Sequence, residues 1–214
     1  MMLETLRNEV WKCNLELPKQ GLVKMTSGNV SGRDPETGLV VIKPSGYNYE
    51  GMMPEDMVVV SLDGTVIEGH LKPSVDASAH LYVYAHRPDV MGMVHTHSPY
   101  ASIFAVLGEP IPACLTASAL LGGEIPLGGY VPIGGDAIGE EMLKKIGHAK
   151  AIIMQNHGVF TIGHSASDAT HMAIEVEEIA KIVHFAMCRG KPVLLPEQAI
   201  AYTGDLYENV RGQR

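Results

Sequence analysis

The chain has 214 residues, of which 46% are hydrophobic and 19% are charged. This length and composition predict one folded domain over residues 1–214 and exclude an intrinsically disordered chain. The formal net charge of −8 at pH 7 repels a phosphate backbone, so we expect no nucleic-acid partner.

Cysteine usage and hydropathy indicate the setting of the protein. The three cysteines, Cys13, Cys114 and Cys188, lie far apart in the sequence and form no C-x-x-C pair. No apolar run approaches the roughly 20 residues that a membrane-spanning helix needs, and the first residues are acidic where an export signal would be apolar. We therefore expect a cytoplasmic protein with no membrane partner.

The first part of the chain predicts one helix and then a strand. Apolar residues recur at steps of three and four over residues 3–17, which indicates an amphipathic helix running up to Pro18. The segment 26–38 is rich in turn residues and opens a loop. It leads into a short strand of β-branched residues at 39–43.

A hairpin and a helix follow before the first histidine pair. Residues 57–69 carry strand formers on both sides of Asp63-Gly64, a dipeptide favoured where both central turn residues need a positive φ. The next segment, 74–87, predicts a helix. Residues 89–97 then read as a buried strand that ends in two histidines.

The remaining elements complete a mixed pattern. Residues 99–108 predict a helix, and the Gly- and Pro-rich segment 111–139 predicts a short strand and loops. Residues 151–163 predict a hairpin turning about His157. The strongest helix spans 165–190, with a serine cap and one apolar face. This order predicts an α/β fold with a largely antiparallel central sheet flanked by helices.

Histidines supply the clearest candidate chemistry. Residues two apart on a strand face the same side, so His95 and His97 present both rings together while Thr96 faces away. His157 lies in a turn at a strand end, and Asp76 begins a helix shortly before the pair. Three imidazoles plus a carboxylate or water would form an open, catalytic type of zinc site. The alternative is that one imidazole is only a hydrogen-bonded core residue.

Six segments occur in one order along the chain: GLVKMTSGNVSGRD, VIKPSGYNYE, PEDMVVVSLDGTVIEG, KPSVD, VHTHSPYA and QNHGVF. With them the sequence resembles the class II aldolase/epimerase superfamily over most of its length. That superfamily includes L-ribulose-5-phosphate 4-epimerases, L-fuculose-1-phosphate aldolases and the non-enzymatic adducin head. The resemblance implies the three-layer fold of this family.

The resemblance also implies two binding sites. One is a site for Zn²⁺, or another divalent transition metal, at His95, His97 and His157, with Asp76 beside it as ligand or acid/base. The other is a phosphate pocket, whose loop amides and hydroxyls suit an oxyanion and whose lysine supplies charge. Its implied members are Thr26, Gly28, Asn29, Lys43, Ser45, Gly46 and Ser74. Taken singly, a PSG or SGN segment is ordinarily just a turn, and Asp76 would cap a helix.

Single positions separate the branches of the superfamily. Asp76 follows KPS, as in the epimerases, whereas the fuculose-type aldolases carry glutamate there. Val75 stands where the epimerases have serine, and Leu120 stands where they have a catalytic aspartate. Thr116 takes the place of an aldolase tyrosine. Because leucine cannot transfer a proton, neither branch's partner acid is intact.

The C-terminal tail, from about residue 196 to 214, is the other implied source of a proton-transfer group. In relatives this tail closes over a neighbouring subunit's site with a tyrosine. Here it offers Tyr202 and Tyr207, and we choose Tyr207 as a catalytic residue beside Asp76. The resemblance thus implies a homotetramer with sites at the subunit interfaces.

The function implied is zinc-dependent retro-aldol chemistry on a phosphorylated ketose, with L-ribulose-5-phosphate 4-epimerase activity as the leading hypothesis. In this chemistry the metal acts as a Lewis acid on the substrate carbonyl. Fuculose-1-phosphate-type aldolase activity and dehydration of a sugar phosphate are the alternatives. An adducin-like binding module without activity is a hypothesis of another class, which the retained histidines argue against.

Overall fold

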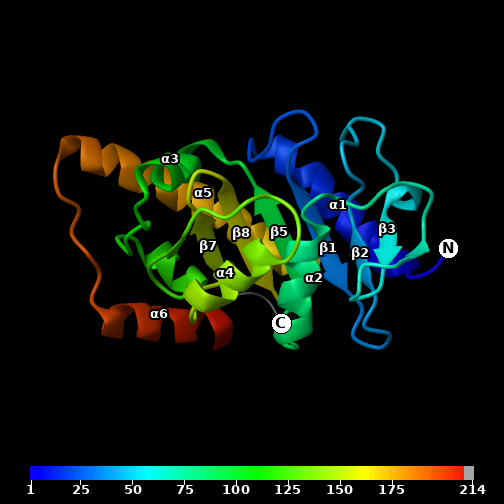
Figure 1. Ribbon diagram of the computed structural model, residues 1–214. Coiled ribbons are helices and arrows are strands. Elements are labelled where there is room, and N and C mark those ends of the chain that lie inside the picture. The colour runs from blue at the N-terminus through cyan, green and yellow to red at the C-terminus, as the bar shows by residue number, and fades with distance from the viewer. Residues whose placement is uncertain (210–214) are drawn as a thin grey trace.

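The computed structural model describes residues 1–209 and centres on one eight-stranded sheet (Figure 1). The order across the sheet is β4-β3-β2-β1-β5-β8-β7-β6, and neighbours are antiparallel except for the parallel pair β6 and β7. The predicted, largely antiparallel sheet is therefore confirmed. In chain order the strands are β1 (Asn29–Arg33), β2 (Val40–Ile42), β3 (Val58–Val60), β4 (Val66–Glu68), β5 (Gly92–Thr96), β6 (Leu127–Gly128), β7 (Ala151–Met154) and β8 (Gly158–Gly163).

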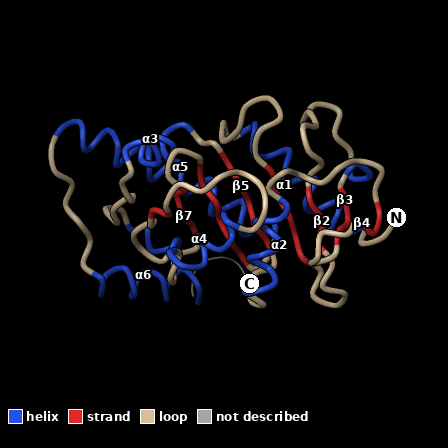
Figure 2. Tube along the Cα trace, in the orientation of Figure 1, coloured by secondary structure: helices blue, strands red, loops and turns tan. Residues whose placement is uncertain are grey.

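Helices cover both faces of the sheet, which gives three layers (Figures 1 and 2). On one face lie α2 (Ala77–His86) and α4 (Ala137–Lys145). On the other lie α1 (Glu4–Lys19), α3 (Pro99–Leu107) and α5 (Ala166–Arg189). The chain also forms two 3-10 helices, η1 (Pro54–Asp56) and η2 (Thr116–Leu121), and a last helix, α6 (Glu197–Asn209).

Side-chain alternation along the strands explains why both faces are covered. In β5, Met93 packs into the cluster beneath α2 and α4, whereas its neighbour Val94 packs into the cluster beneath α1 and α5. In β3, Val58 and Val60 face the first cluster and Val59 the second. Because successive strand residues face opposite sides, an all-apolar strand requires a helical layer on each side.

Both predicted hairpins form, with one difference at the first turn. β3 pairs with β4, and β7 pairs with β8, in antiparallel register. Of the Asp63-Gly64 dipeptide only Gly64 has a positive φ, at 85°. Gly64 N donates to Ser61 O and Ser61 N donates to Thr65 O. The strands are thus joined by a longer loop instead of a two-residue turn with two positive φ angles.

Three helical features differ from the prediction. α1 continues through Pro18 to Lys19. α4 begins inside the segment predicted as loops, where Ile138 and Met142 form a short buried stripe. No helix or strand was predicted for the C-terminal tail, and there the chain forms α6, which has no buried residue and packs on η2. A long loop joins α5 to α6 (Figure 2).

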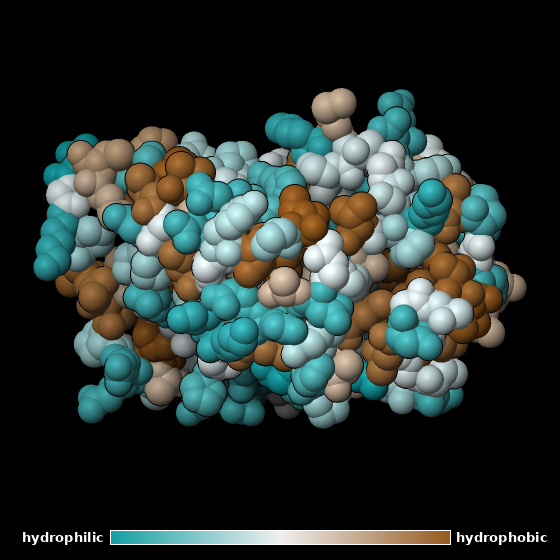
Figure 3. All heavy atoms as spheres, in the orientation of Figure 1, coloured by the Kyte–Doolittle hydropathy of each residue, from teal (hydrophilic) through white to brown (hydrophobic). Residues whose placement is uncertain are grey.

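On the face shown in Figure 3, hydrophobic residues lie in separate groups among hydrophilic ones. Over residues 1–209, every helix is either too short or too polar to span a bilayer.

Candidate functional site

The ends of four neighbouring strands in the middle of the sheet, β2, β1, β5 and β8, surround a small cavity. Because β1 runs antiparallel to β5 and pairs Asn29 with His95, the start of β1 lies beside the end of β5. The start of β8 joins them through the pairing of Thr96 with Val159. The end of β2 lies on the other side of β1. The cavity at these strand ends has a volume of about 220 Å³.

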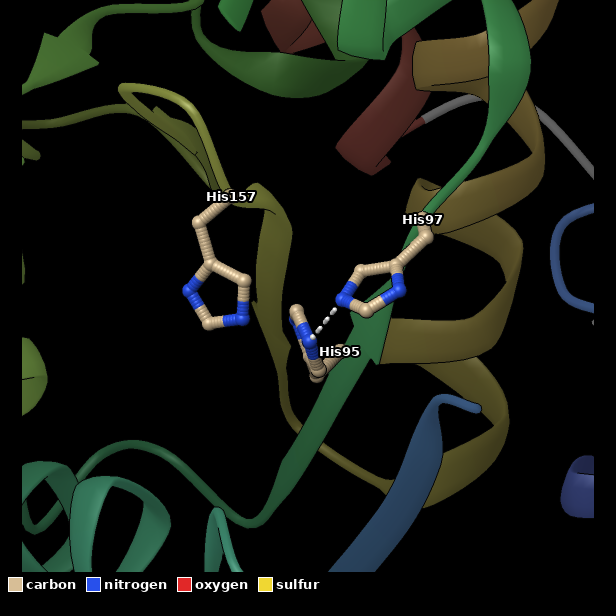
Figure 4. A group of neighbouring side chains, drawn as sticks. All are labelled: His95, His97 and His157. Atoms are coloured by element: carbon tan, nitrogen blue, oxygen red, sulfur yellow. Dashed lines mark hydrogen bonds between the residues drawn. The ribbon is translucent and has the colours of Figure 1, made fainter. Parts of the chain in front are cut away.

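The three predicted histidines converge on this cavity (Figure 4). One nitrogen from each of His95, His97 and His157 lies within 4.8 Å of the other two. The Nε2 atoms of His95 and His97 are 3.0 Å apart. Two ligand nitrogens on a tetrahedral Zn²⁺, each bound at about 2.0–2.1 Å, are separated by roughly 3.3 Å. The spacing therefore suits two ligands of one ion.

The protonation of these rings also suits metal binding. Burial holds the pKa of His95 well below its usual range, and the neighbouring His97 and His157 lower it further. Burial likewise lowers the pKa of His97 and of His157, while the Asp76 carboxylate opposes both shifts. Neutral imidazoles carry the lone pair that a metal ligand needs. His95 Nδ1 lies 3.0 Å from the carbonyl oxygen of Val159, which assigns the proton to Nδ1 and leaves Nε2 free to coordinate.

Two further groups hold the imidazoles in place. A Cβ at Gly158 would clash with Thr96 O and lie 2.8 Å from His97 Cδ2, so a side chain there would force the rings apart. The buried carboxylate of Glu177, on α5, accepts hydrogen bonds from the backbone N–H groups of Tyr100 and Ala101 at the start of α3. It thereby fixes the segment that follows His97. Sequence reasoning assigned neither residue this role.

Asp76 borders the same cavity but is bound differently from the imidazoles. It directly precedes α2 and is buried, with 7% of its surface exposed. Its Oδ2 accepts a hydrogen bond of 2.9 Å from Asn29 Nδ2. The carboxylate oxygens are not among the three ligand atoms that lie within 4.8 Å of one another.

All seven residues implied for phosphate binding line this cavity, next to the histidines: Thr26, Gly28, Asn29, Lys43, Ser45, Gly46 and Ser74. Lys43 is the cation among them. Its Nζ donates to Thr26 O at 3.0 Å and lies 4.8 Å from the centre of the Tyr49 ring. Burial lowers the pKa of Lys43 to about 8, although the nearby Asp76 carboxylate opposes the shift. Lys43 is therefore charged at neutral pH and titrates just above it.

The remaining predicted residues lie elsewhere in the chain. Thr116 and Leu120 are on η2, with Thr116 exposed and Leu120 half-buried. Tyr207 is on α6, which packs against η2. None of these three lines the cavity in a single described chain. Val75 does line it and is 62% exposed.

Ile133 is a lining residue that sequence reasoning missed. It lies in the connection between β6 and α4, is 64% exposed and places an apolar side chain at the cavity beside the polar loops. The surrounding segment is dense in glycine and proline and has no periodicity, so no sequence signal marks Ile133.

Comparisons with known proteins agree with this geometry. The family model for the class II aldolase and adducin N-terminal domain matches residues 8–184. An L-ribulose-5-phosphate 4-epimerase UlaF of Salmonella paratyphi C is 41% identical over 207 residues, covering 91% of this chain and 90% of its own. The UlaF epimerase of Salmonella typhi is 40% identical over 196 residues, covering 86% of each chain.

Solved structures give the same result. An L-fuculose 1-phosphate aldolase superposes with a TM-score of 0.93 at 30% identity, covering 97% of this chain and 98% of its own. The L-fuculose-1-phosphate aldolase of Thermus thermophilus superposes with a TM-score of 0.72 at 25% identity, covering 88% of this chain and 98% of its own. The resemblance predicted from the sequence motifs is confirmed: the chain belongs to the family of the class II aldolase and adducin N-terminal domain.

Proposed function

We propose that the protein is a metal-dependent enzyme that performs retro-aldol chemistry on a phosphorylated ketose, with 4-epimerisation of L-ribulose 5-phosphate as the leading assignment. One observation carries the proposal: three convergent imidazole nitrogens share a cavity with Lys43 and the hydroxyl-bearing loops around it. The relatives named as L-ribulose-5-phosphate 4-epimerases, which match most of the chain, support the same assignment.

The metal would be held by His95, His97 and His157, with Asp76 as a further oxygen ligand or as an acid/base. Neutral nitrogen donors that leave a coordination position open suit Zn²⁺ in a catalytic site. When bound, such an ion supplies Lewis-acid stabilisation of negative charge on substrate oxygen. In Figure 4 the nitrogen of His157 that faces the other two imidazoles is Nε2, while its Nδ1 is buried and, among residues 1–209, lacks a hydrogen-bond partner.

The phosphate group would bind at the other end of the cavity. Lys43 supplies charge, and the hydroxyls of Thr26, Ser45 and Ser74 supply donors. Gly28 and Gly46 both have positive φ, at 75° and 62°, so their loops turn sharply and present backbone groups to an anion. Binding here would orient the carbon chain of the sugar toward the imidazoles.

Proton transfer would fall to Asp76 and to a tail tyrosine. Asp76 lies at the cavity and accepts only one described side-chain hydrogen bond at Oδ2. Tyr207 does not line the cavity of its own described chain, which agrees with a homotetramer in which the tail of one subunit would complete the site of the next. A reducing, cytoplasmic setting suits the three free cysteines.

Aldol cleavage that releases its products is the second candidate function. The specific observation in its favour is the L-fuculose 1-phosphate aldolase structure, which superposes over almost the whole of both chains. Epimerisation and cleavage share the bond-breaking step, and they differ in whether the fragments rotate and recombine or leave.

Product analysis tests the proposal. The zinc-loaded protein is incubated with ¹³C-labelled L-ribulose 5-phosphate, and the products are followed by NMR. Formation of intact D-xylulose 5-phosphate is the expected result, and release of two shorter fragments would move the assignment to an aldolase. An unchanged spectrum would reject L-ribulose 5-phosphate as substrate, and L-fuculose 1-phosphate would then be tested in the same way.

A further inference from the structure

Tyr49 contacts the loop 26–28 of the proposed phosphate pocket without lining the cavity itself. Tyr49 is 7% exposed, and its ring packs into the hydrophobic cluster beneath α1. The segment that carries it is tied to the same helix. Trp11 Nε1, on α1, donates to Met52 O at 2.6 Å, and Met52 N donates to Tyr49 O at 3.3 Å. The position of the Tyr49 ring is therefore set by the core of the protein.

Three successive carbonyl oxygens of this loop are bound by only two side chains. Tyr49 Oη, which carries one hydrogen, lies 2.8 Å from Ser27 O and 3.0 Å from Gly28 O. Lys43 Nζ donates to the third oxygen, Thr26 O, at 3.0 Å. In a trans peptide the C=O and N–H groups point in opposite directions, so the bond at Ser27 O turns the N–H of Gly28 away from Tyr49. Fixing this peptide therefore fixes the direction of an amide donor in a residue that lines the cavity.

The ring of Tyr49 restrains the Lys43 ammonium. Lys43 is 1% exposed, and its Nζ lies over the ring, 4.8 Å from the centroid. Its other described partners are two carbonyl oxygens, Thr26 O at 3.0 Å and Pro44 O at 3.5 Å. The electron-rich face of a ring attracts a cation, whereas a carboxylate in direct contact would neutralise it and compete with a phosphate. The ring thus holds the ammonium and leaves its charge available to a ligand in the cavity.

We propose that Tyr49 is a positioning residue for the phosphate end of the cavity. Its hydroxyl sets the orientation of the loop peptides at Ser27 and Gly28, and its ring holds the Lys43 ammonium, but Tyr49 makes no contact with the bound anion. The inference rests on the proposed function, because that function places a phosphate group at this loop. The contacts of Tyr49 with the loop and with Lys43 are the same whichever phosphorylated ligand binds.

Calorimetric titration of the zinc-loaded, full-length protein with inorganic phosphate is the first test. Tyr49→Phe removes the hydroxyl and keeps the ring, so we expect about tenfold weaker binding. Tyr49→Leu removes both, and its affinity should fall further, toward that of Lys43→Gln, the variant that marks binding at this pocket. The control is Tyr47→Phe, which removes a hydroxyl from a half-buried tyrosine outside the cavity and should leave the affinity unchanged.

Two further measurements separate positioning from a general loss of stability. Zinc content should stay unchanged in Tyr49→Phe, because the polar contacts of this side chain are with the loop and Lys43 and not with the imidazoles. With a sugar phosphate that the protein turns over, KM should rise roughly tenfold while kcat stays within about threefold, because binding is lost equally in the ground state and the transition state. Unchanged phosphate affinity in a folded Tyr49→Leu, or joint loss of zinc and phosphate binding in Tyr49→Phe, would overturn the proposal.

An NMR comparison tests the same contacts without any turnover. In Tyr49→Phe the backbone order parameters of residues 26–28 should fall. In Tyr49→Leu the side-chain protons of Lys43 should also lose the upfield shift that the face of a ring imposes, and Tyr47→Phe should show neither change. Equally rigid loop amides in Tyr49→Phe would refute the role of the hydroxyl. If the wild-type protein binds neither inorganic phosphate nor a sugar phosphate, the proposed function fails, and the NMR changes then decide alone whether Tyr49 positions the loop and Lys43.

Discussion

The two ends of the reaction machinery are built in different ways. The proposed metal and phosphate half is assembled from strand ends within one chain, and its imidazoles are packed by Phe160, Gly158 and the strands around them. The segments from which the resemblance implies a proton-transfer group, η2 and α6, are peripheral, and neither Leu120 nor Tyr207 lines the cavity of the described chain. The first half is thus specified by the packing of the sheet within one chain, whereas the second, under the proposed function, would need another copy of the chain or a different acid.

The largest expected effect follows from loss of one of the three histidines of the proposed metal site. His97→Ala removes one of three nitrogen donors, so we expect loss of bound zinc and a fall in turnover of roughly 10³-fold or more. Metal content by elemental analysis and steady-state kinetics measure both. His171→Ala, which removes an exposed imidazole on α5, is the matched control and should retain metal and activity. Unchanged zinc and turnover in His97→Ala would contradict the metal mechanism.

The second-largest effect is expected at the tyrosine proposed for proton transfer. Tyr207→Phe removes a single hydroxyl and should lower kcat about 10²-fold if this tyrosine transfers a proton. Tyr202→Phe, a change on the same helix at a residue that is 67% exposed, should have no effect.

Mixing two variants tests whether each site combines residues of two subunits. Tyr207→Phe and His97→Ala should each be strongly impaired alone, but their co-refolded 1:1 mixture should recover roughly a quarter of wild-type activity if each site combines residues of two subunits. No recovery in a mixture shown to be tetrameric would place the complete site within one chain.

A smaller effect is expected where the packing around the imidazoles is disturbed but all three histidines are kept. Gly158→Ala introduces a Cβ against Thr96 O and His97, so we expect a loss of roughly 1–3 kcal/mol of stability and about tenfold weaker zinc binding. Thermal unfolding and competition with a chelator measure the two quantities. The control is Gly190→Ala, because a Cβ there meets no atom within 4 Å. Equal zinc affinity in both variants would show that the ring packing tolerates displacement.

The smallest expected effect concerns pH. Burial depresses the pKa of Lys43 to about 8, so the side chain is charged below this value and becomes neutral as the pH rises through it. Affinity for inorganic phosphate should therefore fall several-fold between about pH 7 and pH 9. Lys43→Gln should bind weakly throughout and lose this step. Calorimetric titration at each pH is the measurement, and an equal step in Lys43→Gln would assign the titration to another group.

Sequence reasoning succeeded where local patterns decide the structure. The H-x-H spacing predicted that His95 and His97 share one face, and the turn at His157 predicted a hairpin; the structure brings all three nitrogens together. The antiparallel sheet followed from the order of strands and turns. The family followed from six short motifs and is confirmed by the comparisons.

Other features depend on contacts between distant segments and left little trace in the sequence. Asn29 and Asp76 are 47 residues apart, and no spacing rule connects them. Ile133 lies in a segment without periodicity. α6 has no buried residue. Its sequence is therefore not required to carry the apolar stripe by which a buried helix is recognised. The roles predicted for Tyr207 and for the phosphate loop stay predictions that the variants above address.

The unequal exposure of the three imidazoles has a consequence for exchange of the metal with solvent. His95 is buried, His157 is half-buried and His97 is exposed, and Phe160 stacks against the His95 ring with 4.2 Å between ring centroids. An ion at these nitrogens would therefore enter and leave on the His97 side, where the ligand atoms are most accessible to solvent. A sugar phosphate bound in the cavity, as proposed, would block this route. It would lengthen the residence time of the ion without adding any ligand to it.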